Sequence, residues 1–214
     1  MLYGQVDQRL RVDEAVRQRL GGLVPARSVR QLWCMGGIAL LLILNQAFTG
    51  LLLLCYYQPG PHVAYTSVRY LMEEVPLGWL IRGLHAWGAH LLVLAVVIHM
   101  IKVFLSKAYR PPRELNWMVG TVLFGLTFTF AFTGHLLPWD QVAYWSTTVG
   151  TDNVRSLPVL GASLLLYLRG GPGVSDATLA RFFVLHTVVL PWLTVLLLAA
   201  HFAMVRRQGL SRPL

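Results

Sequence analysis

The stretch HAWGAHLLVLAVVIHM, residues 85–100, places two histidines, His85 and His99, fourteen positions apart in a segment built mostly from Ala, Leu, Val and Ile. A run this apolar is typical of a helix that crosses a membrane. Ionisable side chains inside such a helix are rare and usually mark a functional site. The stretch therefore predicts a transmembrane helix with one functional imidazole near each end.

The whole chain has the composition of a membrane protein. Of its 214 residues, 56% are hydrophobic and 13% are charged, whereas roughly one quarter of the residues are charged in a soluble domain. A helix needs roughly 20 apolar residues to cross the hydrocarbon core, and four runs are long enough: 33–56, 84–105, 116–137 and 182–205. The sequence thus predicts an all-α fold, a bundle of four transmembrane helices.

The basic residues predict the orientation of this bundle. Most of the 18 Lys and Arg residues lie in the N-terminus, the loop between the second and third spans, and the C-terminus. Because cationic loops stay on the cytoplasmic side, both termini are predicted to be cytoplasmic or stromal, here called the N side. The positive charge that flanks membrane spans suits lipid headgroups, so no nucleic-acid partner is expected.

Two segments outside the spans are predicted to lie at the membrane surfaces. Residues 6–20, VDQRLRVDEAVRQRL, read as an amphipathic helix on the N side, and no cleaved signal peptide is expected. Residues 156–168 are apolar but would form a helix only about 20 Å long, so they are predicted to be a short helix on the opposite, P side. The predicted organisation is an N-side segment, 1–30, followed by a single four-helix domain, 31–214.

The second and fourth spans each carry two histidines and cross the membrane in the same direction. The spacing is 14 residues from His85 to His99 and 15 from His186 to His201. At about 100° per residue, these spacings return to within about −40° and +60° of the starting direction, after a rise of about 21 to 23 Å. His85 is therefore predicted to lie level with His186 on the P side, and His99 level with His201 on the N side.

These matched pairs favour iron ligation. A single histidine in a membrane helix usually bonds to a neighbouring helix or lines a cavity. Two pairs at two depths instead suit two b-type haems, because a planar macrocycle between helices takes one imidazole from each side. We expect His85 and His186 to bind the iron of a P-side haem b, and His99 and His201 the iron of an N-side haem b.

Glycines in the first and third spans repeat the same spacing. Gly36 and Gly50 are fourteen residues apart, as are Gly120 and Gly134. They are ordinary small-residue helix contacts in one interpretation. In the other, the missing side chains let a haem edge approach the helix backbone, and each haem would meet two histidines and two glycines.

Five motifs resemble the cytochrome b6 type of the cytochrome b superfamily, which corresponds to the N-terminal half of the longer members. The resemblance covers essentially the whole chain. The 15-residue histidine spacing in the fourth span is also similar to the b6 type. The motifs are WCMGG at 33–37, WLIRGLH at 79–85, PRELNW at 112–117, LPWDQVAYW at 137–145 and RFFVLHTVVLPWL at 181–193.

The resemblance implies further cofactors and substrates. The cysteine that matches Cys34 carries a covalent haem c in this family, so we expect two b haems and one haem c. Quinol is expected as the substrate and quinone as the N-side acceptor, with Tyr144 and Trp145 as candidate residues of the quinol site. An aromatic belt at the membrane interface is the alternative explanation for these two rings.

Basic residues near the histidines are candidate partners of the haem propionates, since buried anions need cations or hydrogen bonds. They are Arg82, Lys102 and Arg206, and the alternative is that they are interfacial cations that reach toward the headgroups. His135 stands where the family commonly has Tyr. His62 and His90 have no expected ligand role, and His90 is interpreted as a histidine that packs between helices.

By this resemblance the chain is predicted to be the electron-transfer subunit of a quinol:electron-acceptor oxidoreductase that translocates protons, in a bacterial inner membrane or a thylakoid. Expected partners are a subunit IV-like C-terminal cytochrome b part, a Rieske iron-sulfur protein and a c-type cytochrome, in a homodimeric complex with membrane lipids. Two alternatives remain at this point. One is a dihaem anchor of a dehydrogenase or hydrogenase, and the other is a haem-free transporter.

Overall fold

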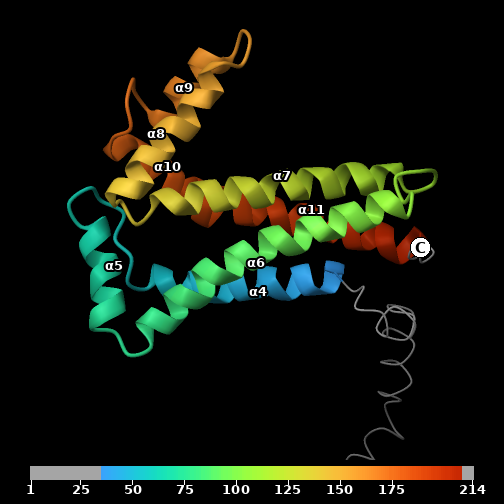
Figure 1. Ribbon diagram of the computed structural model, residues 1–214, viewed down its shortest axis with the longest axis horizontal. Helices are drawn as coiled ribbons and strands as arrows, with labels where there is room; N and C mark the ends of the chain where they lie inside the picture. Colours follow the sequence, from blue (N-terminus) through green and yellow to red (C-terminus); the bar gives the residue numbers. More distant parts are fainter. Residues whose placement is uncertain (1–34, 209–214) are drawn as a thin grey trace, which may run out of the picture.

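The computed structural model describes residues 35–208, and every regular element in this range is helical (Figure 1). The amphipathic segment predicted at 6–20, the boundary at 30/31 and Cys34 lie outside the described residues. The elements, in chain order, are α4 Met35–Leu54, α5 Ala64–Glu73, α6 Gly78–Leu105, α7 Glu114–Leu136, α8 Gln141–Arg155, α9 Gly161–Arg169, α10 Asp176–Val184, the π-helical segment η1 Leu185–Val189 and α11 Leu190–Gln208.

The four predicted spans are confirmed as helices that are long and apolar enough to cross a membrane. They are α4, α6, α7 and the continuous helical run α10–η1–α11, Asp176–Gln208. The second span begins at Gly78 rather than at residue 84, and the fourth at Asp176 rather than at residue 182. Backbone hydrogen bonding does not stop where the apolar run stops, so both helices continue past the ends that hydrophobicity predicts.

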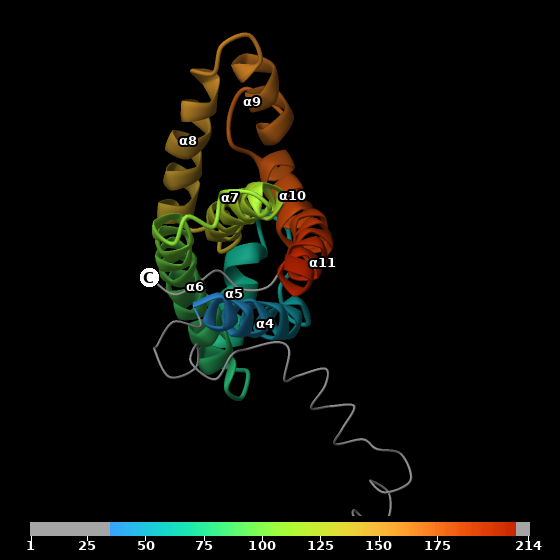
Figure 2. The ribbon, with the colours of Figure 1, turned by 90° about the vertical axis from the view of Figure 1, so that its right-hand side faces the viewer.

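The four long helices form one bundle with its small helices at one end (Figure 1). The start of α4 and the end of α11 lie together at the opposite end. Figure 2 shows the bundle nearly end-on, with α4, α6, α7 and α11 around its axis. Within the described residues α4 packs on α6, α6 on α7, and α7 on α11, whereas α6 and α11 do not pack closely against each other.

Close packing of α4 on α6 depends on Gly88. A Cβ atom at this position would lie 2.5 Å from both Asn45 Nδ2 and Gln46 Nε2, which is closer than a carbon and a nitrogen can approach. Asn45 Nδ2 donates to the carbonyl of Leu84, 3.1 Å away. A glycine therefore lets two polar side chains of α4 pack against α6 about one helical turn after His85.

The segment predicted to stay out of the membrane, 156–168, forms a turn and most of the nine-residue helix α9. α9 packs against α8 as a helical hairpin that extends away from the bundle (Figure 1). α8 starts with an N-cap, because the Asp140 side chain accepts a hydrogen bond from the amide of Ala143 at 2.8 Å. The Asp of the motif LPWDQVAYW thus has a structural role in starting this hairpin.

One buried arginine holds the hairpin together. Arg169 is 4% exposed. Its guanidinium donates to Thr151 Oγ1 at 2.7 Å and to the Thr148 carbonyl at 2.6 Å, and it forms an ion pair with Asp152 at 2.9 Å. The partners of Arg169 span about one turn of α8, so these bonds join α9 to α8. The stability of the hairpin therefore depends on charge-assisted hydrogen bonds as well as on apolar packing.

We expect Arg169→Met to destabilise the hairpin by about 3 kcal/mol, because several hydrogen bonds to a charged group are lost. Hydrogen exchange of the amides in α8 and α9 should accelerate accordingly in the purified protein. The control is Arg69→Met, which removes the exposed Arg69–Glu73 pair and should cost little. Equal exchange rates in the two variants would contradict the role given to Arg169.

Candidate functional site

His85 of α6 and His186 of η1 face each other at the end of the bundle that carries the small helices, the predicted P side. Their ring centroids are 6.4 Å apart and the ring planes are inclined at 73°. Two metal–imidazole bonds of about 2 Å, with each ring centre about 1.1 Å beyond its nitrogen, give a separation of about 6.2 Å. The two rings are therefore spaced as axial ligands of one metal ion.

Two threonines hold these rings through their other nitrogen. Thr49 Oγ1 lies 2.9 Å from His85 Nδ1, and Thr133 Oγ1 lies 3.0 Å from His186 Nδ1. Both threonines are buried. A side chain that engages Nδ1 leaves Nε2 as the ligating nitrogen and fixes the orientation of the ring, which is the usual environment of a metal-binding histidine.

The second pair, His99 of α6 and His201 of α11, lies toward the other end of the bundle. The two side chains are close enough to interact electrostatically. His99 lies against Gly36 of α4, and His201 lies against Gly120 of α7. The structure thus brings together the same two pairs that the histidine spacings predict.

Each of the four predicted glycines lies directly against one of the four imidazoles. A Cβ atom would be 2.6 Å from His186 Cε1 at Gly134, 3.2 Å from His99 Cε1 at Gly36, 3.3 Å from His85 Cε1 at Gly50 and 3.6 Å from His201 Cε1 at Gly120. The missing side chains therefore make space for the histidines themselves, in addition to any approach of a macrocycle edge. The alternative that these glycines serve only as helix contacts is not needed.

The unequal spacing of the histidines has a local cause in the fourth span. His186 lies in η1, where the amide of Leu190 bonds to the carbonyl of Leu185, five residues back. Pro191 follows, and its missing N–H and its ring disturb the regular helix here. A π-helical turn takes up one extra residue, so the 15-residue spacing acts as about 14 α-helical residues. The offset of about +60° was expected for a regular helix, and the π-helical turn reduces it.

The donor set suits a haem better than a metal ion bound by protein alone. Within residues 35–208, no three His, Cys, Asp or Glu side chains come together as a metal site. Each imidazole pair would supply two nitrogen ligands to one iron, which is a donor set that a haem uses. The residues present therefore fit two bis-histidine haems.

The three candidate propionate partners lie in different surroundings. Arg82 is half-buried on α6, one turn before His85, and its Nη1 lies 3.8 Å from Met72 Sδ. Lys102 is half-buried near the end of α6, and Arg206 is exposed near the end of α11. Arg82 is thus on the P side with His85, and the other two are on the N side with His99 and His201.

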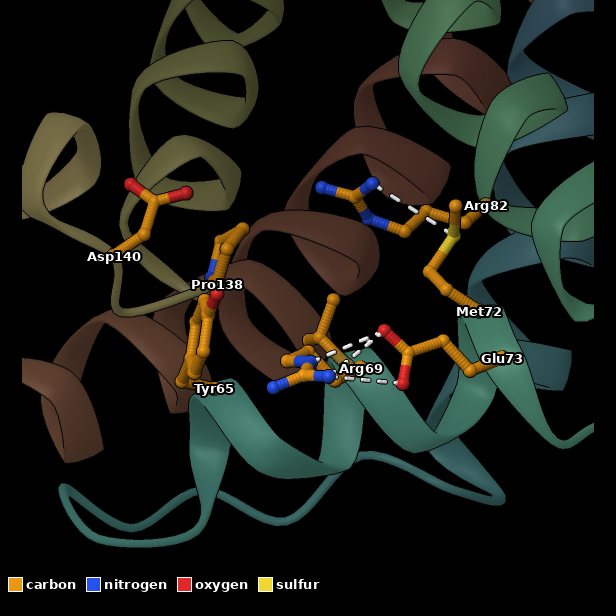
Figure 3. Close-up of a pocket in the computed structure, with 8 residues that line it drawn as sticks. Tyr65, Arg69, Met72, Glu73, Arg82, Pro138 and Asp140 are labelled. Carbon is orange, nitrogen blue, oxygen red and sulfur yellow. Dashed lines mark hydrogen bonds and ion pairs between the residues drawn. The ribbon is translucent and has the colours of Figure 1, made fainter.

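A pocket of about 270 Å³ lies on the P side beside Arg82 (Figure 3). The side chains of α5 form one wall and the turn that precedes α8 forms the other. Its charged groups balance, with two arginines and two carboxylates. The lining residues are Tyr65, Val68, Arg69, Met72, Glu73, Arg82, Pro138 and Asp140.

Tyr144 and Trp145 do not line this pocket. Tyr144 packs edge-on against Trp139 and Trp145, and its hydroxyl donates to the Val174 carbonyl at 3.4 Å. Trp145 is 60% exposed, and its Nε1 donates to Gln141 within α8. Both rings lie at the P-side end of the bundle, where an aromatic belt would also lie.

The remaining histidines are exposed. His62 and His135 are on the P-side surface, and His90 is on the outer face of α6. His90 Nδ1 bonds to the carbonyl of Ala86, and the ring packs on Trp87 of the same helix. The interpretation of His90 as a histidine packed between helices of this chain is therefore wrong, although it does face away from His85 as predicted.

Comparison with known proteins gives a consistent result. Residues 20–209 match the sequence profile of the family described as Cytochrome b/b6/petB. The chain belongs to the cytochrome b family. It is 42% identical to a cytochrome b6 of Synechococcus sp. (strain JA-3-3Ab) and 43% identical to one of Gloeobacter violaceus, each over 100% of this chain and 99% of the relative.

A solved structure titled "Hyperthermophilic respiratory Complex III" has a chain with the same fold. The TM-score is 0.84 at 31% sequence identity, over 98% of this chain. This chain spans 56% of the length of that one. Membership in the cytochrome b family makes this protein a transmembrane electron carrier that uses haem iron.

The sequence analysis missed Thr49 and Thr133 as site residues. The signal was present, because each threonine directly precedes one of the paired glycines, Gly50 and Gly134. Each threonine is next to a glycine that lies against the imidazole, so its hydroxyl can reach the same ring.

We expect Gly134→Ala to reduce the content of b haem more than Gly120→Ala does. The added methyl would lie 2.6 Å from His186 Cε1 in the first variant and at an ordinary 3.6 Å from His201 Cε1 in the second. Forcing the ring aside should cost about 1 to 3 kcal/mol. Pyridine haemochrome analysis per mole of purified protein measures this difference, and equal haem content in both variants would contradict it.

Proposed function

We propose that the chain is the b6-type cytochrome b subunit of a quinol:electron-acceptor oxidoreductase. The observation that carries this proposal is the presence of two imidazole pairs, one at each end of the bundle, in a chain that matches cytochrome b6 proteins over its full length. The complex oxidises quinol on the P side and delivers electrons toward quinone on the N side. This movement is coupled to proton translocation.

His85 and His186 are the proposed axial ligands on the P side, and His99 and His201 those on the N side. A b-type haem at each position supplies a one-electron Fe(III)/Fe(II) couple. The chain contributes the Nε2 donors and, for His85 and His186, fixes the ring orientation through Nδ1. Arg82 on the P side and Lys102 and Arg206 on the N side hold the propionates by charge.

The P-side substrate region is proposed at the end of the bundle that carries LPWDQVAYW. Pro138 and Asp140 line the pocket beside Arg82, and Tyr144 and Trp145 lie a short distance further along the same segment. We assign the two aromatic rings to the wall of the quinol site. A subunit IV-like partner is proposed to complete this wall, as the resemblance to cytochrome b6 implies.

The proposed partners follow from the resemblance to cytochrome b6. A subunit IV-like protein supplies the C-terminal part of cytochrome b, a Rieske iron-sulfur protein accepts one electron of each quinol, and a c-type cytochrome follows. The complex is proposed to be a homodimer in a bacterial inner membrane or a thylakoid, with both termini on the N side. Many apolar side chains on the bundle are exposed, among them Leu41, Phe48 and Trp87, which suits contact with lipid and partner helices.

The two alternatives have less support. A haem-free transporter does not explain two imidazole pairs that each face a glycine. A dihaem anchor of a dehydrogenase or hydrogenase does not explain the motifs PRELNW and LPWDQVAYW, nor the match to cytochrome b6 proteins over the whole chain.

We expect His186→Leu to remove the P-side haem and leave the N-side haem in place, because the two pairs share no ligand. Redox titration of membranes, followed by the reduced-minus-oxidised visible spectrum, should then show one b-type wave in place of two. Absence of b-type absorbance from the parent protein would end the proposed function.

The order of the two potentials is a second expected outcome of the parent titration. An electron that moves to the N side works against the membrane potential, at about 2.3 kcal/mol per 100 mV for a full crossing. The haem at His99 and His201 should therefore have the higher midpoint potential. The reverse order would contradict the direction of electron flow.

Cys34 is the proposed attachment site of a haem c. It lies outside the described residues, two positions before Gly36, which lies against His99. A thiol at this position is close to the N-side pair in the sequence, and the family resemblance supports a single thioether bond. The attached haem would stand between the N-side haem b and quinone.

We expect the parent protein to keep one haem after acid-acetone extraction, and Cys34→Ser to keep none, because only the thioether resists this treatment. Haem staining of a denaturing gel measures the retained haem. Cys55→Ser is the matched control, since Cys55 lies at the other end of α4 in an exposed position. Haem retained in Cys34→Ser would contradict the assignment.

A further inference from the structure

The two P-side imidazoles are each bonded to a threonine in the same way, although the threonines are on different helices. We infer that Thr49 and Thr133 act as positioning residues that lower the midpoint potential of the P-side haem by accepting hydrogen bonds from its axial histidines. The inference rests on the proposed function, since it takes His85 and His186 as axial ligands. It gives the two threonines a role in setting the midpoint potential of the P-side haem.

The direction of each hydrogen bond follows from a second bond of the same hydroxyl. Thr49 Oγ1 donates its proton to the Asn45 carbonyl at 2.6 Å, and Thr133 Oγ1 donates to the Thr129 carbonyl at 2.8 Å. A hydroxyl has only one proton. Each oxygen must therefore accept from the imidazole Nδ1–H, at 2.9 Å from His85 and 3.0 Å from His186.

The resulting chains run from Nδ1–H through the hydroxyl to a helix carbonyl. Hydrogen bonds in such a chain polarise one another. Thr49 is 2% exposed and Thr133 is 3% exposed, so water does not compete for these bonds. The chains fix the tautomer that presents Nε2 to the iron and hold each ring in one orientation.

An imidazole that donates its Nδ1–H to an acceptor is a more basic ligand at Nε2. A more basic ligand stabilises the oxidised iron, which has the higher charge, more than the reduced iron. The midpoint potential of that haem is therefore lowered. Two such ligands on one haem act in the same direction.

The two glycines that lie against the N-side pair are not preceded by threonine. The residues that directly precede Gly36 and Gly120 are Met35 and Val119, whereas Thr49 and Thr133 precede Gly50 and Gly134. Neither Met nor Val offers a hydroxyl acceptor. The threonines thus act on one haem only, and they widen the difference in potential that favours electron movement toward the N side.

The test is a redox titration of the assembled complex in membranes that carry Thr49→Val, Thr133→Val or both. Valine keeps the shape of threonine and removes the acceptor. We expect the ferric-to-ferrous ratio of the P-side haem to change roughly 3- to 10-fold per threonine at a fixed solution potential. A tenfold change corresponds to about 59 mV for a one-electron couple, and the shift is upward. The N-side wave should stay in place.

Two sets of controls separate tuning from a general structural effect. Thr127→Val removes a hydroxyl of α7 that bonds only to the carbonyl of Leu123 in the same helix, and it should shift neither wave. Thr49→Ser and Thr133→Ser keep the hydroxyl and should restore the parent potential. The P-side wave is identified as the one lost in His186→Leu.

The inference is overturned if both haems are present at parent levels in the valine variants and the P-side potential is unchanged, or if the serine variants shift as far as the valine variants. If a valine variant loses the P-side haem, the same titration is made on the alanine variant at that position. An unchanged P-side potential in that variant then overturns the inference. These outcomes differ from failure of the proposed function, in which the parent membranes themselves show no b-type spectrum.

Discussion

The structure depends on one constraint: two helices that cross the membrane in the same direction must present imidazoles to each other at two depths. α6 and α11 satisfy it without packing closely on each other within the described residues, because each is supported by a neighbouring helix, α6 by α4 and α11 by α7. The supporting helices carry a glycine opposite every imidazole. The four histidines therefore lie where the helices meet, and a buried apolar cluster of Ala64, Leu136, Leu179 and Phe182 adds to the packing.

The same constraint explains features that would otherwise be defects of a helix bundle. The π-helical turn at His186 interrupts a long span, yet it brings the 15-residue histidine spacing into the register of its 14-residue counterpart. Thr49 and Thr133 place polar groups inside the bundle, yet each hydroxyl has both a donor and an acceptor. Buried polar groups are stable when their hydrogen bonds are complete, and here they also orient ligands.

Much of this arrangement could be predicted from the sequence. Long apolar runs and paired histidine spacings have strong periodic signals, and both the four spans and the pairing are as expected. The helix starts at Gly78 and Asp176 were missed because amphipathic turns beyond the apolar runs carry no hydropathy signal. The π-helical turn and the threonine contacts could not be predicted, because they depend on neighbouring helices. His90 was expected to pack between helices but is exposed on α6. A lipid-facing residue and a helix-packing residue have the same pattern in the sequence.

The central claim is that each imidazole pair holds one iron porphyrin between its Nε2 atoms. An experimental density map of the purified complex tests it most directly. The account predicts two flat densities with metal at their centres, one joined to His85 and His186 and the other to His99 and His201. A map in which the paired imidazoles bond to each other, to water or to protein groups, with no macrocycle between them, would contradict it.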